Sequence, residues 1–373
     1  MEGQGGSLFE HIRIISDPRA EKNKRHPLET IIFIAICGVT CGAEGWTDLQ
    51  RFGELKKEWL SKYVDLSRGV PSHDTFGRFF ALLDPKGFQE GFLGWIRSIH
   101  EKTQGRIVSL NGKSLRRSHD RSKGKEALHL VHAWASENHL LLGEIKTNAK
   151  SNEITAIPEL LKLLDLQGAI VTVDAMGTQK EIVGKIVDKG GDYVVALKGN
   201  HGVFHEEVEQ YWEDSQLRKE ADRYETTEKG HGRLEQRRHW STEDLNWFAD
   251  KAKWPGLRSI GCVESERTIQ EQTSVERRYY LSSTSLRADA QELARAVRAH
   301  WSIENNLHWV LDVVFREDES RVRIGHAAEN FALLRRMALS LIKKESTSKA
   351  SLKGKRFSAA LSDAYLEKIL FQN

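Results

Sequence analysis

The sequence contains few cysteines: Cys37, Cys41 and Cys262 are the three in 373 residues. This odd, sparse set offers no disulfide framework, which excludes a disulfide-stapled miniature protein and predicts a reducing cytoplasm. Cys37 and Cys41 lie four residues apart in an apolar segment, so we expect them on one face of a helix. With no second cysteine pair, two buried thiols are favoured over half of a metal site.

Long hydrophobic runs are also absent. The most apolar run, residues 31–43, has 13 residues, whereas a membrane span needs about 20. It follows a charged stretch that is too long for the start of a signal peptide. We therefore expect a soluble, bacterial-style cytoplasmic protein with no membrane contact.

The overall charge shows little excess of one sign. Lys and Arg number 56 and Asp and Glu 53, for a net charge of +3, which argues against a protein that coats nucleic acid through bulk charge. The 39% hydrophobic and 29% charged residues exclude a disordered chain or a collagen. At about 100–200 residues per domain, the length indicates two or three structural units.

Local charge is less even. Residues 113–125 hold six basic residues and one acid, a net +5, and residues 335–356 hold eight and one, a net +7. The first patch directly follows a strand-like run at residues 106–110, and such a basic patch suits a phosphodiester substrate. A solvated charged loop is the alternative, and it has more weight for the C-terminal patch.

The periodicity of apolar residues divides the chain. Residues 1–104 are predicted to form an N-terminal helical domain, because apolar residues recur at three- and four-residue steps, as in Trp46–Tyr63. Pro71–Thr75 is typical of a turn and a helix N-cap. Residues 346–373 are predicted to be a basic C-terminal tail.

Residues 105–345 carry a different pattern. Three strand-like runs (106–110, 128–135 and 139–145), a helix (154–164), a strand (169–173), a helix (179–187), a strand (193–197) and a helix (203–211) follow in order. A hairpin followed by βαβ units predicts an α/β fold with a ribonuclease-H-like mixed sheet flanked by helices, antiparallel at one edge and parallel at the other. Residues at about 215–285 are polar, with β-like pieces at 258–263 and 274–281, and are interpreted as a β-rich insertion before the last catalytic helix. Helical character resumes at Ala288 and runs through Trp309 to Ile342.

Two polar residues follow neighbouring predicted strands. Asp174 ends an apolar strand, where ligands gather in α/β sheets, and its carboxylate could hold Mg²⁺ or cap the next helix. The matching position on the first strand is Asn111, which can offer a carbonyl oxygen to a metal but no charge.

A third candidate lies on the late helix, where His300, Glu304 and His308 are four residues apart. Glu304 could complete a metal site with Asp174. The three together could form a zinc hydrolase site, although three residues over more than two turns of one straight helix do not readily surround one ion. Otherwise they form an exposed polar stripe. The nearby acids Asp312, Glu317 and Asp318 would support the site or be solvated.

Several stretches carry a family resemblance: 25–28 (RHPL), 42–46 (GAEGW), 71–75 (PSHDT), 150–161 (KSNEITAIPELL), 173–177 (VDAMG), 198–200 (KGN), 231–233 (HGR) and 300–312. Over about residues 9–370 the chain resembles the H-repeat-associated proteins, insertion-sequence transposases of the DDE superfamily. The resemblance implies a ribonuclease-H-like core that cuts and joins double-stranded DNA at element ends with Mg²⁺ or Mn²⁺, two ions expected, as a homodimer or higher multimer.

The resemblance also assigns residues. The catalytic and metal-binding triad falls on Asn111, Asp174 and Glu304, but the first acid belongs in an Asp-Gly-Lys context, which here is Asn111-Gly112-Lys113. Expected DNA contacts are Lys113, Arg116, Arg117, Lys198, Asn200, His231, Arg233 and His300. Three interpretations stay open: an active transposase that tolerates Asn111, an impaired or inactive copy that still binds DNA, and a zinc hydrolase.

Overall fold

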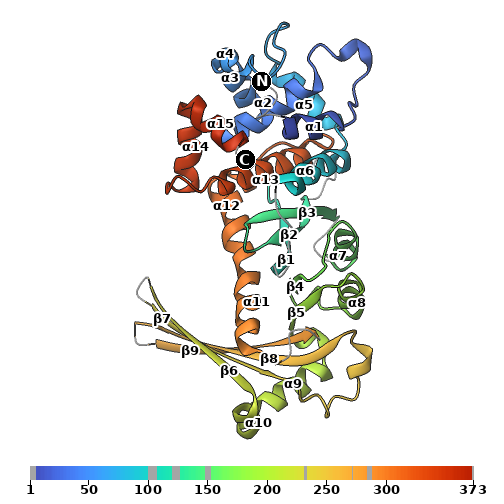
Figure 1. Ribbon diagram of the computed structural model, residues 1–373, viewed down its shortest axis with the longest axis vertical. Helices are drawn as coiled ribbons and strands as arrows, with labels where there is room; N and C mark the ends of the chain where they lie inside the picture. The colour runs from blue at the N-terminus through green and yellow to red at the C-terminus, as the bar shows by residue number, and fades with distance from the viewer. Residues whose placement is uncertain are drawn as a thin grey trace.

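In the computed structural model, a helical body at one end of the molecule adjoins a nine-stranded mixed sheet with helices on its faces (Figure 1). The structure describes residues 6–99, 107–119, 127–147, 153–230, 233–270, 272–283 and 288–371. The two ends of the chain both lie in the helical body.

The N-terminal segment is helical, as predicted. It contains α1 (Gly6–Arg13), the 3₁₀ turn η1 (Glu21–Asn23), α2 (Leu28–Cys41), α3 (Trp46–Leu55), α4 (Lys57–Leu60), α5 (His73–Leu82) and α6 (Pro85–Ile99). The single helix predicted over Trp46–Tyr63 is divided at Lys56. The predicted cap is confirmed, because the Ser72 hydroxyl accepts a hydrogen bond from the Thr75 amide at the start of α5.

Helix α2 is the centre of the helical body. Twelve of its 14 residues are buried, which explains why it is apolar on every side. Cys37 and Cys41 lie on it as free thiols, the first buried and the second half-buried, as expected. The helix ends at Gly42, whose φ of 118° is the left-handed conformation that favours glycine.

The C-terminal segment packs on α2 and is not a tail. Helices α13 (Ala327–Lys344), α14 (Leu352–Leu361) and α15 (Asp363–Phe371) all contact α2. Leu366, Ile369 and Leu370 are buried in the same hydrophobic core as α2. The Glu367 carboxylate accepts a hydrogen bond of 2.8 Å from the Trp59 indole. Apolar burial therefore outweighs the basic charges that suggested a solvated tail.

The sheet has the order β3-β2-β1-β4-β5-β9-β8-β7-β6. Its first five strands are β1 (Ile107–Ser114), β2 (His129–Ala135), β3 (Leu140–Thr147), β4 (Ile170–Val173) and β5 (Asp192–Leu197). The strands β1, β2 and β3 pair antiparallel, and β1, β4 and β5 pair parallel, as the order of elements predicted.

Alternate residues of these strands face opposite layers of helices. Val108 and Val171 point into a core with α7 (Glu153–Lys162), α8 (Lys180–Asp188) and α9 (Val203–Glu213), and the short α10 (Ser215–Glu220) follows. Their neighbours Ile107 and Ile170 pack against α11 (Ala290–Ile303) on the other face. Figure 1 shows α11 and the α7–α8 pair on opposite sides of the strands.

The predicted insertion is a regular antiparallel meander. It consists of β6 (Asp222–Gly230), β7 (Arg233–Thr242), β8 (Leu257–Ile269) and β9 (Gln272–Ser283), and β9 pairs antiparallel with β5, so the meander extends the main sheet. The sequence indicated pieces of β8 and β9 but not β6 or β7. Most side chains of β6 are exposed on both faces, so that strand has no apolar alternation to detect. Cross-strand ion pairs such as Arg238–Glu264, at 2.9 Å, accompany the pairing instead.

The late helical region is interrupted where the sequence suggested continuity. After α11 come a π-helical turn (Glu304–His308), α12 (Trp309–Val313) and the 3₁₀ turn η8 (Glu317–Glu319), before α13 begins at Ala327. Within the described ranges, no single helix is long and apolar enough to span a membrane. The pair α2 and α3 passes that test only together, with a bend of 95° between them.

Candidate active site

Asn111 and Asp174 come from two adjacent parallel strands. The last paired residues of β1 and β4 in this register are Leu110 and Val173, so the next residue of each chain segment reaches the same edge of the sheet. Both side chains are half-buried and line one cavity of about 200 Å³. Asn111 and Asp174 therefore meet because each follows the carboxyl end of one of two neighbouring parallel strands.

Asp174 is held by the turn that follows its strand. Its Oδ1 accepts hydrogen bonds of 3.1 Å from the backbone amides of Met176 and Gly177. One carboxylate oxygen thus orders the loop toward α8, which is the capping role considered for it. Oδ2 forms no hydrogen bond with another described residue, so the side chain can cap this turn and still present an oxygen to the cavity.

Glu304 reaches the same cavity from the end of α11. Two hydrogen bonds fix that end of the helix to the sheet: the Ser109 hydroxyl donates to the Ala299 carbonyl at 3.2 Å, and the Thr172 hydroxyl lies 3.0 Å from His300 Nδ1. The Asn111 amide donates to Glu304 Oε1 at 3.4 Å, although 193 residues separate the two. The three residues predicted as a triad are therefore brought together.

His300 has a structural contact in this arrangement. It lines the cavity, but its ring is bound to Thr172, and burial lowers its pKa to about 4 even though the nearby Asp174 carboxylate acts in the opposite direction. The ring is neutral at pH 7 and carries no charge for a DNA phosphate. Its contact with β4 instead positions the helix turn that bears Glu304.

The strand β9 supplies residues to the cavity that the sequence analysis missed. Glu276, Arg278 and Tyr280 alternate along β9, and all three line the cavity. The Arg278 guanidinium lies 4.6 Å from the ring centroid of Trp301 and forms two hydrogen bonds with Glu276, of 2.8 and 3.0 Å. The two-residue spacing was a usable signal, but it lay in the segment interpreted as an insertion.

The expected DNA contacts separate into different environments. Lys198 is exposed and lines the cavity, and the exposed Asn200 donates to the Ala175 carbonyl at 2.9 Å in the loop behind Asp174. Lys113 is buried, and its ammonium lies 2.6 Å from Asp312 Oδ1, so it is not a free surface cation. We correct its assignment from a DNA contact to a structural ion pair.

The remaining expected contacts are farther along the surface. Arg116 is exposed and pairs with Asp318 at 3.2 Å, and Arg117 is exposed in the same loop. Arg233 begins β7 at the tip of the meander, with its guanidinium 3.8 Å from Glu235. His231 lies outside the described residues, as do the basic residues at 121, 123 and 125.

Half of the basic residues in the C-terminal patch, residues 335–356, are buried and do not form a charged surface. Arg335, Arg336, Lys355 and Arg356 are all buried. Arg336 lies 2.8 Å from Glu144 and 2.8 Å from Glu317, two buried carboxylates. Glu317 is therefore not the solvated acid that was one interpretation of it.

The zinc triad is not formed. The π-helical turn that begins at Glu304 adds a residue to the turn and carries His308 away from His300. His308 Nε2 lies 3.3 Å from His132 Nδ1, and burial lowers the pKa of His308 well below its usual value. No group of three or more His, Cys, Asp or Glu side chains that could hold a metal occurs in the described part of the chain.

The donors at the cavity fit a hard divalent cation. Asp174 and Glu304 offer carboxylate oxygens and Asn111 an amide oxygen, which are the ligand types that Mg²⁺ and Mn²⁺ accept. The set carries two negative charges from these three residues. With an Asp at position 111 it would carry three.

Comparisons with known proteins identify the family of the chain. The family model described as DDE_Tnp_1-associated matches residues 9–96, and the model described as Transposase DDE domain matches residues 98–341. The chain is 42% identical to "Putative transposase YncI" of Escherichia coli O157:H7, over 98% of this chain and 94% of that one. It is 40% identical to "H repeat-associated putative transposase YhhI" of Escherichia coli strain K12, over 97% of each.

A solved piggyBac transposase synaptic complex with hairpin DNA aligns with 98% of this chain and 77% of that chain, at a TM-score of 0.43 and 12% identity. The family models and the full-length relatives are sufficient: the chain belongs to the DDE transposase family.

Proposed function

We propose that the protein cuts and joins double-stranded DNA at the ends of an insertion sequence, by metal-dependent phosphoryl transfer at Asn111, Asp174 and Glu304. The observation that carries the proposal is the meeting of these three residues in one cavity, from two parallel strands and a helix distant in sequence, in a chain of this family. The strand order β3-β2-β1-β4-β5 supports a ribonuclease-H-like catalytic body.

The proposal also divides the chain. Residues 105–345 form the catalytic body with the meander inserted, and residues 1–104 form an associated helical domain. Because α14 and α15 pack on α2, residues 346–371 belong with that helical domain, and α13, at the end of the catalytic body, packs on the same helix. A homodimer or higher multimer on paired DNA ends is the expected assembly.

The residues of the cavity have distinct tasks. Asp174, Glu304 and the Asn111 amide oxygen would hold the cations, with two Mg²⁺ or Mn²⁺ ions proposed. Such ions activate the attacking hydroxyl and stabilise the leaving oxygen when bound. Lys198 and Arg278 would hold the phosphate, because a cation beside the reacting group stabilises charge that develops in the transition state. Ser109 and Thr172 hold the end of α11 in place through Ala299 and His300.

Asn111 is the weak member of the site. Its amide removes one of three anionic ligands, so we propose that metal affinity and turnover are impaired relative to a site with three acids. The competing proposal is a relic that binds DNA without cutting it. The contact of Asn111 with Glu304 leaves room for both proposals.

The test is strand cleavage of a duplex that carries the ends of the element encoding this chain, with Mg²⁺ or Mn²⁺. We expect slow cleavage by the wild type, faster cleavage by Asn111→Asp, and none by Asp174→Ala in either background. Asn305→Asp, which adds the same charge next to Glu304 on an exposed position, is the matched control and should not accelerate cleavage.

The outcomes separate the alternatives. Cleavage by the wild type equal to that by Asn111→Asp would show that Asn111 does not impair the site. Cleavage that survives Asp174→Ala would remove Asp174 from it. If Asn111→Asp is also inactive while DNA binding persists, the relic is the correct description.

A further inference from the structure

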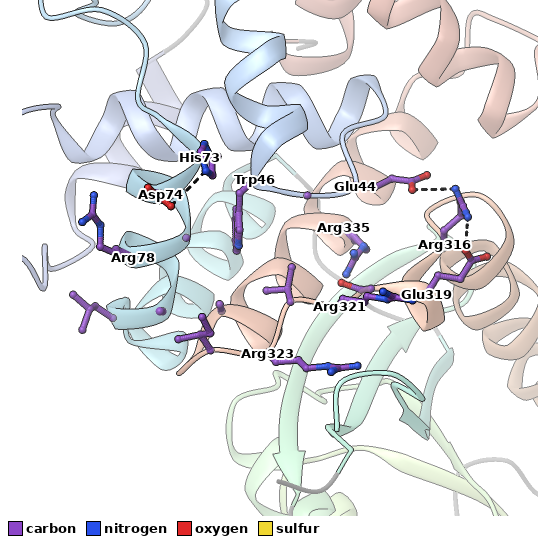
Figure 2. Close-up of a pocket in the computed structure, with 18 residues that line it drawn as sticks. Glu44, Trp46, His73, Asp74, Arg78, Arg316, Glu319, Arg321, Arg323 and Arg335 are labelled. Carbon is purple, nitrogen blue, oxygen red and sulfur yellow. Dashed lines mark hydrogen bonds and ion pairs between the residues drawn. The ribbon is translucent and has the colours of Figure 1, made fainter. Parts of the chain in front are cut away.

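A second, larger cavity lies between the helical body and the segment that follows α12. It has a volume of about 940 Å³ and is lined by α3, α5, the segment 316–324 and the start of α13 (Figure 2). Three of its lining side chains are acidic and five are arginines: Arg78, Arg316, Arg321, Arg323 and Arg335. None of these arginines belongs to the catalytic cavity.

Arg335 is a buried cation that forms no ion pair with another described residue, although the Glu317 and Glu44 carboxylates favour its charged form from a distance. Its exposed fraction is 1%, and its Nε has no hydrogen-bond partner. Among the described residues, its recorded contact is with the ring of Phe331, whose centroid lies 4.4 Å from the guanidinium carbon. Burial lowers its pKa to about 10, so the side chain is still protonated at neutral pH.

The carboxylates near Arg335 are already engaged. Glu317 is bound to Arg336 at 2.8 Å, and Glu44 lies 3.2 Å from Arg316. Arg316 also binds Glu319. A buried cation is costly unless it is paired, so the charge of Arg335 indicates that an anion is to be accommodated in this cavity.

Two more arginines stand at the cavity without a partner. Arg78 on α5 and Arg321 form no hydrogen bond or ion pair with another described residue. Arg316, at the same cavity, is paired with Glu44 and Glu319. In Figure 2, Arg321 and Arg335 lie on one side of Trp46, whereas Arg78 lies on its other side and projects outward from α5. Guanidinium groups suit phosphate because each can donate two parallel hydrogen bonds.

The wall of this cavity contacts the loop that leaves the active site. Arg323 Nε donates to the Arg117 carbonyl at 3.0 Å, and the Arg116 guanidinium pairs with Asp318 at 3.2 Å. That loop follows β1, the strand that carries Asn111. A polyanion that enters the catalytic cavity and continues past this loop would meet the second cavity, which favours a DNA backbone over a small isolated anion.

We propose that this cavity is a DNA-backbone site, in which the buried Arg335 anchors one phosphate and the exposed Arg78 and Arg321 each contact a further phosphate of the same duplex. The inference rests on the proposed function, because it takes the DNA substrate as the ligand. Phosphate contacts of this kind position a duplex and do not read its sequence.

The test is the salt dependence of binding, since each phosphate contact releases counterions. A labelled mixed-sequence duplex of about 30 base pairs is titrated with the full-length protein by fluorescence anisotropy at several NaCl concentrations. The variant is Arg78→Gln with Arg321→Gln. The matched control is Arg218→Gln with Lys219→Gln, which removes the same charge from α10 at the far end of the molecule (Figure 1).

We expect the slope of log K against log[salt] to become shallower by about 1.8 in the cavity variant, at about 0.9 per contact, and the affinity at 0.1 M salt to fall by up to about 60-fold. The control should keep a slope close to that of the wild type. Equal slopes for the two double variants would overturn the inference while leaving the proposed function intact. A wild type that does not bind the duplex would overturn both.

Arg335 is tested separately, because its removal can affect folding. The rise in melting temperature caused by the same duplex is compared for wild type, Arg335→Lys and Arg335→Met. We expect the rise to be retained in large part by Arg335→Lys, which keeps the charge, and to shrink in Arg335→Met. An equal rise in wild type and Arg335→Met would overturn the anchoring role, and the rim variants decide the site if Arg335→Met does not fold.

Discussion

The substitution Asn111→Asp probes the metal site without any DNA. In the metal-free protein it replaces an amide that donates to Glu304 Oε1 at 3.4 Å by a second carboxylate at that position. Two unit charges at this distance repel by ~1.2 kcal/mol in water and by ~5 kcal/mol at an effective dielectric constant of 20. Since Glu304 is exposed, we expect the metal-free variant to be less stable by about 1–2 kcal/mol.

The pH dependence of this loss has a definite sign. The repulsion acts only while both carboxyl groups are ionised, and a carboxyl group in an unfolded chain loses its charge as the pH falls through about 4. A repulsion that is present only between the charged forms in the folded state lowers stability at pH values at which both groups are ionised. The loss should therefore be complete near pH 7 and disappear as the pH falls through about 4, where both states are protonated.

Urea unfolding in EDTA and in MgCl₂ measures the effect. Mg²⁺ should reverse the loss and stabilise Asn111→Asp more than the wild type, because binding to the folded state alone adds stability. Asn305→Asp is the control, since adjacent helix residues point in different directions. If Asn111→Asp is as stable as the wild type in EDTA and gains nothing extra from Mg²⁺, then residue 111 and Glu304 do not share a cation site.

Three further predictions concern the framework of the site. Arg336→Met should cost about 3–5 kcal/mol of unfolding free energy in urea, because it leaves two buried carboxylates unpaired, and a loss below about 1 kcal/mol would contradict that account. Gly112→Ala should cost about 1–3 kcal/mol, since an added Cβ would lie 2.3 Å from Glu153 Oε1 and 2.7 Å from His129 Nε2. Gly230→Ala is the control, because no atom of the described residues lies within 4 Å of the added Cβ, and this variant should melt as the wild type does. Deleting residues 352–371 should abolish cooperative thermal unfolding by circular dichroism, because it exposes the buried face of α2, and an unchanged melting curve would show that α14 and α15 are dispensable.

The elements that were predicted correctly are those with a buried face. The strands β4 and β5 are buried on both faces and are continuous in apolar residues, and α2 is apolar because it is buried on every side. In these segments the pattern of apolar residues and the tertiary environment carry the same information. The strand β6 was missed because most of its side chains face solvent, and β7 was missed because its buried residues, His239, Trp240 and Ser241, are consecutive and mostly polar and so show no apolar alternation.

Charged residues were the least predictable from sequence. Residues 335 and 336 belong to a basic run that suggested a DNA-binding surface, yet Arg336 is a buried partner of two carboxylates and Arg335 lies under a cavity. Lys113 is likewise buried against Asp312. Counting charged residues gives the net charge of a segment, but it does not tell whether each side chain contacts water, a carboxylate or a cavity. The surroundings of a side chain are formed by segments that are far away in the sequence.

The sequence by itself determined the family and the mixed antiparallel and parallel pairing of the first five strands, because these depend on local residue types and on their spacing. Only the tertiary structure decided which side chains meet. His308 lies in a π-helical turn and contacts His132 instead of joining His300, and β9 brings Arg278 to the cavity of Asn111, Asp174 and Glu304. Burial places Arg336 and Lys355 of the basic run in ion pairs and leaves Arg335 without one among the described residues. These contacts depend on the packing of segments that are up to 193 residues apart, as for Asn111 and Glu304. The electrostatic energy of a charged side chain depends on the groups packed around it more than on its neighbours in the sequence.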